Sequence, residues 1–322
     1  HYNLALQTLT PLALQLSNRK NMRSNQYEPI AQAMAARGVP IATELIWGLP
    51  GDNLAEFEAN LDRLSAIFPN INIFGYTLLP GTEFYERRDE YRIEAVPVAG
   101  YGKAKGEYVI GCHTFERDEG IEGYFLITAH IVLVRGYVMP LTSRLLALEA
   151  VGSVSALLRA VLRALVQAFA SDGPNLDLQD RMGIYENRDR LYLAMLRRPD
   201  ECFRVIDDTV MQWMRAQGAT EAQLDRARKT LAIDEACCPR VGPGRTVTRT
   251  FDFPAGQVLQ DLGRMQLPGE DAFTGRGATL HFAHPGHVGE VLRDPDGGSW
   301  MRGQPVQDAA AGEDVVANPG HA

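Results

Sequence analysis

Cysteine is scarce in this sequence, and its spacing follows no metal-binding pattern. Four cysteines occur in 322 residues, at Cys112, Cys202, Cys237 and Cys238. No pair has the spacing of a zinc or cluster motif. So sparse a set is typical of free thiols in a reducing compartment, and we expect the vicinal Cys237 and Cys238 to be incidental thiols rather than a redox pair. The composition therefore predicts a cytoplasmic protein without a metal site of its own.

The sequence also lacks a long apolar run and an excess of basic residues. The most apolar stretch, 124–140, is interrupted by His130 and Arg135 and is shorter than the roughly 20 apolar residues that span a bilayer. We therefore expect a buried core helix there and no membrane partner. The net charge is −8, which disfavours a nucleic-acid partner because such proteins usually carry a basic surface.

What the first 92 residues do contain is an alternation of strands and helices. Strands are predicted at 4–8, 41–47 and 71–79. Helices are predicted from Pro11, over 27–37, and from Asp52 or Asn53 to about residue 68, where either polar residue can cap the helix. Three βα units in a row predict a parallel sheet with right-handed crossovers. Ligands of such sheets bind at the carboxyl ends of the strands.

One carboxylate stands in an apolar strand. Glu44 lies within Ile41–Asn53, a segment that reads as a buried strand, a glycine turn and a helix start. An ionised group in such a strand must be paired or hydrogen-bonded, or it costs several kcal/mol. Gln7 and Arg19 belong to the preceding unit, so an amide, a guanidinium and a carboxylate are predicted at or near the carboxyl ends of consecutive units.

These motifs resemble the second half of a radical S-adenosylmethionine enzyme barrel. The residues that carry the likeness are Leu-Gln-Thr at 6–8, Asn-Arg at 18–19, Glu-Leu-Ile-Trp-Gly-Leu-Pro-Gly-Asp at 44–52 and Leu-Leu-Pro-Gly-Thr-Glu-Phe-Tyr at 78–85. Their order is similar to that in oxygen-independent coproporphyrinogen oxidases, and the continuation resembles the cobalamin-binding subgroup. The likeness reaches to about residue 115. It implies an α/β fold that is the carboxyl-terminal half of a partial TIM-like barrel.

The resemblance implies S-adenosylmethionine, a [4Fe-4S] cluster and, in the subgroup, cobalamin as cofactors. Arg19 would pair with the S-adenosylmethionine carboxylate, and Gln7 and Glu44 would bind its ribose hydroxyls. The backbone at Gly48 to Gly51 would allow close approach of the nucleoside. The family holds its cluster with Cys-x3-Cys-x2-Cys, which is absent here, so we expect the cluster ligands and the missing amino-terminal half of the barrel upstream of His1.

The remaining chain is expected to form a mostly helical domain, 101–240, and a loosely ordered region, 241–322. After a possible strand at 107–115, helices are predicted over 119–139, 141–170 and 199–218, and from a Thr220–Gln223 capping box to about residue 235. Arg159 and Arg163 are expected on a solvated face. Residues 241–322 hold 14 glycines and 7 prolines, near the level of weakly ordered segments, although alternation at 246–253 and 279–284 indicates short strands.

Two weaker candidate sites and several functions remain open from the sequence. His281, His284 and His287 are expected in an exposed turn rather than in a metal site, and Cys112-His113 is too weak a signal for a nucleophile and base. The leading function is radical chemistry on an organic small molecule. Cobalamin-assisted methyl transfer is the particular reaction that analogy with the subgroup suggests. The alternatives are a porphyrinogen-oxidase-like enzyme without cobalamin and a non-catalytic accessory module that lost the cluster.

Overall fold

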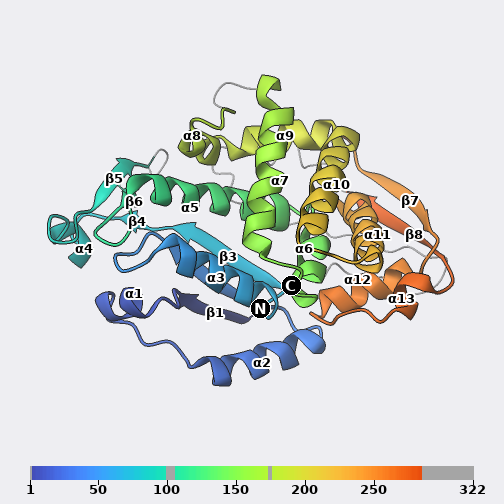
Figure 1. The fold of residues 1–322 in the computed structure, drawn as a ribbon, viewed down its shortest axis with the longest axis horizontal. Coiled ribbons are helices and arrows are strands. Elements are labelled where there is room, and N and C mark those ends of the chain that lie inside the picture. The colour runs from blue at the N-terminus through green and yellow to red at the C-terminus, as the bar shows by residue number, and fades with distance from the viewer. Residues whose placement is uncertain (1, 99–105, 173–175, 285–322) are drawn as a thin grey trace.

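The computed structural model describes residues 2–98, 106–172 and 176–284 (Figure 1). Its first part is a three-stranded parallel sheet in the order β1-β2-β3, and its strands close no barrel within these ranges. The strands are β1 (Tyr2–Gln7), β2 (Ile41–Trp47) and β3 (Asn70–Gly75), and the connecting helices are α1 (Pro11–Leu16), α2 (Ser24–Ala36) and α3 (Leu54–Ser65). The predicted α/β class and parallel sheet are confirmed. Helix α2 begins three residues earlier than the pattern indicated, and Asn53, not Asp52, caps α3.

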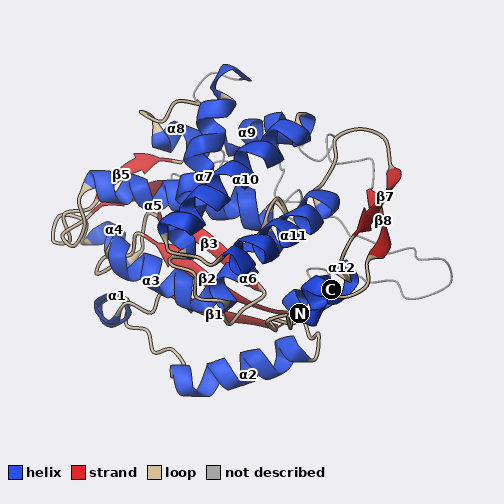
Figure 2. Cartoon of the chain, turned by 45° about the vertical axis from the view of Figure 1, so that its right-hand side comes forward, coloured by secondary structure: helices blue, strands red, loops and turns tan. Residues whose placement is uncertain are grey.

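The two faces of this parallel sheet are covered to different degrees. On one face Thr43, Leu45 and Trp47 of β2 are fully buried, and α2, α3 and α5 (Arg117–Ala129) pack on the sheet. Figure 2 shows the β1–β3 strands with α2 drawn below them and α5 above them. We call the other side the open face, which consists of Asn3, Ala5, Ala42, Glu44, Ile46, Asn70, Asn72 and Phe74. Most of these residues are partly or fully exposed, and Phe74 is 47% exposed.

A second, antiparallel sheet follows in the order β4-β6-β5. Its elements are β4 (Thr77–Leu78), β5 (Glu94–Pro97) and β6 (Glu107–Gly111), with the short helix α4 (Glu83–Glu86) after β4. The single strand predicted at 71–79 is therefore wrong, because the chain leaves the parallel sheet at Gly75 and β4 pairs with β6 instead. The strand predicted at 107–115 ends at Gly111, where the chain turns into an isolated bridge between Cys112 and Phe115.

The helical part is longer and more broken than the periodicity predicted. Helix α5 continues into the π-helix η1 (His130–Arg135), so the apolar run at 124–140 is a buried core segment as expected. The helix predicted at 141–170 is two helices, α6 (Pro140–Leu148) and α7 (Val154–Ala168). The break lies at Ala150 and Gly152, whose φ values of 53° and 73° are left-handed and cannot continue a right-handed helix.

Five further elements complete the helical core. They are the 3-10 turn η2 (Ala170–Asp172) and helices α8 (Arg181–Glu186), α9 (Arg188–Arg197), α10 (Pro199–Ala216) and α11 (Glu221–Cys237). The α10 helix and the Thr220–Gln223 capping box are confirmed. Helices α8 and α9 were not predicted. The large apolar cluster of this region is built mainly from α5, α7, α9, α10 and α11.

Residues 245–284 form a small module against α6 and α11. Strands β7 (Arg245–Phe251) and β8 (Ala278–His284) pair antiparallel, which confirms the predicted alternation, and α12 (Ala255–Gly263) and α13 (Asp271–Thr274) lie between them. Phe251, Phe253 and Phe282 are buried in an apolar cluster that the module shares with α6 and α11. The expectation of a loosely ordered region is therefore wrong for 245–284, because regularly spaced apolar residues close a core despite the glycine content. The rest of that prediction, 285–322, lies outside the described residues.

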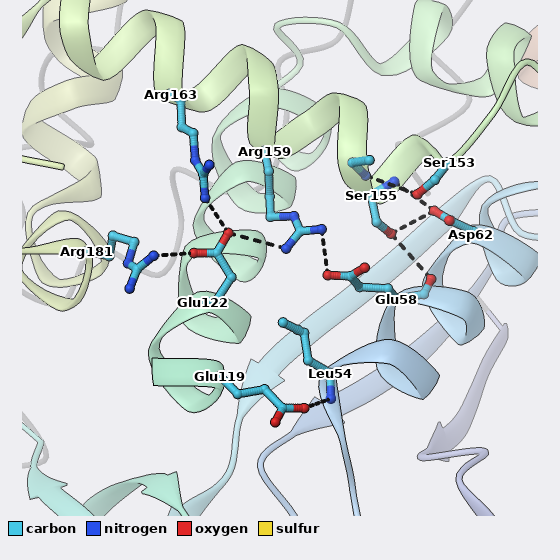
Figure 3. A network of polar contacts seen from close by, with 11 residues as sticks. Leu54, Glu58, Asp62, Glu119, Glu122, Ser153, Ser155, Arg159, Arg163 and Arg181 are labelled. Carbon is cyan, nitrogen blue, oxygen red and sulfur yellow. Dashed lines mark hydrogen bonds and ion pairs between the residues drawn. The ribbon is translucent and has the colours of Figure 1, made fainter. Parts of the chain in front are cut away.

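The sheet part and the helical part are joined by buried packing and by a polar network. Gly123 lets α5 approach β2 closely, since a Cβ there would lie 2.2 Å from the Trp47 ring. Figure 3 shows the network, in which Glu122 of α5 accepts hydrogen bonds from Arg159, Arg163 and Arg181. Arg159 also pairs with Glu58 of α3 at 2.6 Å. The expected solvated face is therefore wrong for Arg159, whose side chain is 19% exposed and joins α3 to α5. It holds for Arg163, which pairs with Glu122 of α5 but is 48% exposed.

No single helix in the described ranges is long and apolar enough to cross a membrane. The segments Arg117–Arg135 and Pro140–Leu148 satisfy that test only as a pair, which is bent by 107°.

Candidate functional site

Glu44 lies in the middle of β2, on the open face of the parallel sheet. It is partly exposed rather than buried, because the side chains of β2 alternate and its neighbours Thr43 and Leu45 take the buried side. Its Oε1 accepts a hydrogen bond from Asn3 Nδ2 of β1 at 2.5 Å, and its register partner in β3 is Asn72. The strand was predicted correctly, but its carboxylate needs no buried partner because one face of the sheet is open.

Gln7 ends β1 in a strained turn. Its φ is 60°, and the Thr8 N–H donates to the Leu6 carbonyl across it at 2.7 Å. A three-residue turn with positive φ is rare, and such strain is often found at functional sites. Gln7 pairs in register with Leu45, one position from Glu44. The structure therefore brings Gln7 and Glu44 to neighbouring strands at adjacent levels of the sheet.

Arg19 follows α1 in the chain and contacts the backbone of β1. Its Nη2 donates to the Ala5 carbonyl of β1 at 2.9 Å. Two residues later, Asn21 Nδ2 donates to the carbonyls of Leu6 and Thr8. Within the described ranges Arg19 forms no ion pair with Glu44, since each side chain bonds to β1 instead. The three predicted residues are thus grouped around β1 and β2 but do not bond to one another.

Gly48 and Gly51 form the turn after β2, and the fold itself requires both. Their φ values are 95° and 99°, which side-chain-bearing residues rarely adopt. A Cβ at Gly51 would lie 2.7 Å from the Ala13 backbone nitrogen of α1, and one at Gly48 would lie 3.3 Å from the Val109 carbonyl oxygen. The close approach that these glycines allow is thus made to segments of this same chain.

Asp52 is a buried acid that the sequence analysis considered only as a helix cap. It is 1% exposed, and its Oδ1 accepts a long hydrogen bond of 3.4 Å from Thr8 Oγ1. In the described part of the chain, Asp52 Oδ2 and Thr10 Oγ1 are buried without a hydrogen-bond partner. Burial raises the pKa of Asp52 to about 7, although the hydroxyls of Thr10 and Thr8 act to lower it. The pair Asp52-Asn53 was the sequence signal for this buried acid, because only one of the two residues can cap α3.

The weaker candidates do not combine into a site. His281 bonds to Thr248 Oγ1 at 2.9 Å, whereas His284 is 4% exposed in β8, so the expected exposed turn is wrong for both; His287 lies outside the described residues. Burial lowers the pKa of His284 to about 4. His113 contacts the Tyr91 ring and Cys112 contacts Thr114, so Cys112 and His113 have different partners.

The described residues do not provide ligands for an iron–sulfur cluster. No three of their His, Cys, Asp or Glu side chains gather closely enough to hold a metal ion. Burial raises the pKa of Cys202, and it raises the pKa of Cys238 to about 12, which disfavours the thiolate that binds metals. The described residues therefore do not fit an iron–sulfur cluster.

The fit to S-adenosylmethionine is partial. Glu44 uses Oε1 for Asn3, and in the described ranges Oε2 remains an acceptor for a ribose hydroxyl. Gln7 lies on the neighbouring strand in register with the buried Leu45, and Arg19 commits one nitrogen to Ala5. The close contacts of Gly48 and Gly51 on their Cβ side are within the chain, and their role toward the nucleoside stays a prediction. Two cavities of the described residues lie elsewhere, one between α10 and α11 and one beside His130.

In comparisons with known proteins, no family model matches this chain and no curated protein matches it.

Proposed function

We propose that this chain is the carboxyl-terminal half of a radical S-adenosylmethionine barrel and that Glu44 on its open face contributes to cofactor binding. The observation that carries this proposal is the uncovered polar face of a parallel sheet. Parallel sheets are normally buried on both faces, yet here Asn3, Glu44, Asn72 and Phe74 remain partly or fully exposed. Such a face is the inner wall of a barrel whose other strands are supplied elsewhere.

The topology of the sheet supports the same interpretation. The strand order is sequential. Helices α3 and α5 contact the face that carries Trp47, through Phe57 and Gly123, and α2 contacts β2. Doubly wound folds reverse their strand order and place helices on both faces, whereas an arc of a barrel has sequential strands and helices on the outside. The free edge of β1 and the exposed apolar side chains of Tyr2, Leu12 and Ile30 offer a surface for a preceding βα unit.

In the complete barrel, the cofactors would supply a carbon radical, and this chain would orient S-adenosylmethionine. The Glu44 carboxylate would accept hydrogen bonds from the ribose hydroxyls, and the Gln7 amide would add a donor and an acceptor from the end of the neighbouring strand. The Arg19 guanidinium, which retains free N–H groups beyond its bond to Ala5, would pair with the carboxylate of the methionine moiety. Cobalamin-assisted methyl transfer to an organic small molecule in the cytoplasm is the form of the reaction that the resemblance favours; a porphyrinogen-oxidase-like reaction is its alternative.

Reading the coding frame before His1 is the first test. A Cys-x3-Cys-x2-Cys motif on the loop of an upstream βα unit is expected, because this chain lacks the cluster ligands. A start codon immediately before His1 would contradict the enzyme proposal. That result would favour the accessory module, for which the specific observation is the absence of a metal-binding group among the described residues.

The second test measures S-adenosylmethionine binding by calorimetry in the complete polypeptide. Glu44→Gln is expected to weaken binding about tenfold, which corresponds to about 1.4 kcal/mol for a lost charge-assisted hydrogen bond. Glu56→Gln is the matched control, because Glu56 is exposed on α3, away from the open face. The iron–sulfur absorbance should be unchanged in both variants. Unaltered affinity in Glu44→Gln would refute the assignment of Glu44.

A further inference from the structure

A small cavity lies at the junction of the sheet and helical parts, and none of its lining residues belongs to the open face. It is lined by the end of α3, the start of β3, the π-helix η1, and helices α6 and α7. Its volume is about 20 Å³, enough for one water-sized particle. Two of its lining side chains, His130 and Arg144, are buried groups with hydrogen-bonding capacity that the protein does not satisfy.

Arg144 is a buried cation without a carboxylate partner. It is 9% exposed, and its Nη2 donates to the Pro69 carbonyl at 2.7 Å. Its Nε has no hydrogen-bond partner within the described residues, and no carboxylate there forms an ion pair with its guanidinium. A guanidinium stays charged in proteins, and an unpaired buried charge is costly. The side chain therefore needs a negative neighbour.

His130 faces the same cavity with a second unused group. It is 2% exposed, and its Nδ1 lacks a partner in the described part of the chain. Burial, with a smaller effect from Arg135, lowers the pKa of His130 to about 3, so the ring is neutral and can donate one N–H. The hydroxyl groups of the cavity are already committed, since Ser143 donates to the Met139 carbonyl and Ser65 donates to the Leu61 carbonyl.

Asp234 is the nearby acid, but its oxygens are engaged elsewhere. It is fully buried and accepts hydrogen bonds from the backbone N–H groups of Leu141 and Thr142 and from the Thr142 hydroxyl. It thereby caps the start of α6 rather than pairing with Arg144. Burial also raises the pKa of Asp234 to about 7, although these bonds act to lower it. Asp234 therefore neutralises the positive charge of Arg144 only in part.

We propose that the cavity binds one small monovalent anion of the halide class, held by Arg144 Nε–H and by an N–H of His130. Two side chains with unpartnered nitrogens, Arg144 and His130, line one small cavity, and Arg144 is the charged side chain among its lining residues. The anion would neutralise the buried guanidinium where α3, β3 and α6 meet. This inference is independent of the proposed enzymatic function, because it concerns the junction and not the open face.

The direct test is crystallisation of the full chain in sodium bromide, with diffraction data collected at the bromine edge. An anomalous peak in the cavity, within hydrogen-bonding distance of Arg144 Nε, is the expected result. A water only at that position, with no anomalous signal, would overturn the proposal, and so would an adventitious ion bound at the surface alone.

A solution test measures unfolding by urea in sodium chloride and in sodium gluconate of equal ionic strength, because gluconate is too large for the cavity. Above the dissociation constant, the unfolding equilibrium constant should fall about tenfold for each tenfold rise in chloride. Arg144→Met, which keeps the length and removes the charge, should lose this dependence. Arg163→Met, at a half-exposed arginine, should retain it. Equal stability of the wild type in the two salts would contradict the proposal, whether or not Arg144→Met folds.

Discussion

The sheet part and the helical part of this protein bury their side chains in different ways. The helical part closes its core on itself, and Leu157, Val161 and Leu162 of α7 are fully buried. The parallel sheet buries one face equally well but leaves the other uncovered, with Phe74 47% exposed. The difference teaches that the two parts are unequal as folding units. The helical part buries its own apolar side chains, whereas the sheet exposes a face that a further segment would cover.

The sharpest test of this comparison truncates one apolar side chain in each part. Leu162→Ala should lower the free energy of unfolding by about 3 kcal/mol, because it removes buried methyl groups and leaves a cavity. Phe74→Ala should cost less than about 1 kcal/mol, because nearly half of the ring is already in water. Urea unfolding followed by circular dichroism measures both. Equal losses would mean that the open face is covered in solution.

A second test concerns the pH dependence that Asp52 brings to the sheet part. Its folded pKa is about 7, above the usual value of about 3.9 in unfolded chains. Below pH 4 both states are protonated. As the pH rises from about 4 to about 7, the unfolded state ionises more readily, so stability is lost over this window and stays lost above it.

Asp52→Asn should remove that loss and be more stable than the wild type by about 2 kcal/mol at pH 8, with little gain at pH 4. This value is about half of the stability change that the pKa difference of Asp52 between the folded and unfolded states would give. We expect the smaller value because local relaxation of the fold admits water to the carboxyl group. The measurement is urea unfolding across this pH range. Asp118→Asn, at an exposed position in the first turn of α5, is the control and should keep the wild-type profile. An unchanged pH slope in Asp52→Asn would refute the interpretation.

The smallest effect is expected at the polar network that joins the two parts (Figure 3). Glu122 is 12% exposed and pairs with three arginines. Glu122→Gln should cost about 1 to 2 kcal/mol, because Arg159 and its neighbours lose a charged acceptor.

Arg163→Ala is the matched variant for this network. Arg163 is 48% exposed, so its loss should cost less than about 0.5 kcal/mol and should depend on salt. Urea unfolding at low and high salt distinguishes the two variants. If Arg163→Ala were as costly as Glu122→Gln, the network would be a set of equivalent pairs rather than one centred on Glu122.

Sequence patterns predicted the regular elements well where local chemistry decides them. The strand at 41–47, the α10 helix and the Thr220–Gln223 capping box follow from periodicity and capping. The break between α6 and α7 could not be predicted, because Ala150 adopts a left-handed conformation that alanine disfavours and only packing enforces. The end of β3 was missed for a similar reason, since β4 continues the apolar pattern but pairs with a distant strand.

The positions of the candidate residues in the fold were predicted only in part, and their role as a site stays a prediction. Gln7, Arg19 and Glu44 are indeed grouped around β1 and β2, as the alternation of strands and helices implied. The strained turn at Gln7 and the bond of Arg19 to Ala5 depend on backbone positions that no local pattern encodes. Asp52 was missed because its neighbour Asn53 makes the cap, and burial then leaves the acid with few partners.

The sequence by itself determined the βα alternation, the parallel direction of the strands and the main helical faces, because these follow from apolar periodicity and right-handed crossovers. Only the tertiary structure decided which sheet face is bare, which arginines reach Glu122 and where Arg144 is buried beside His130. Burial and partnership are set by contacts between segments far apart in the chain, and the free energy of a charged or apolar side chain depends on those contacts rather than on its neighbours in sequence.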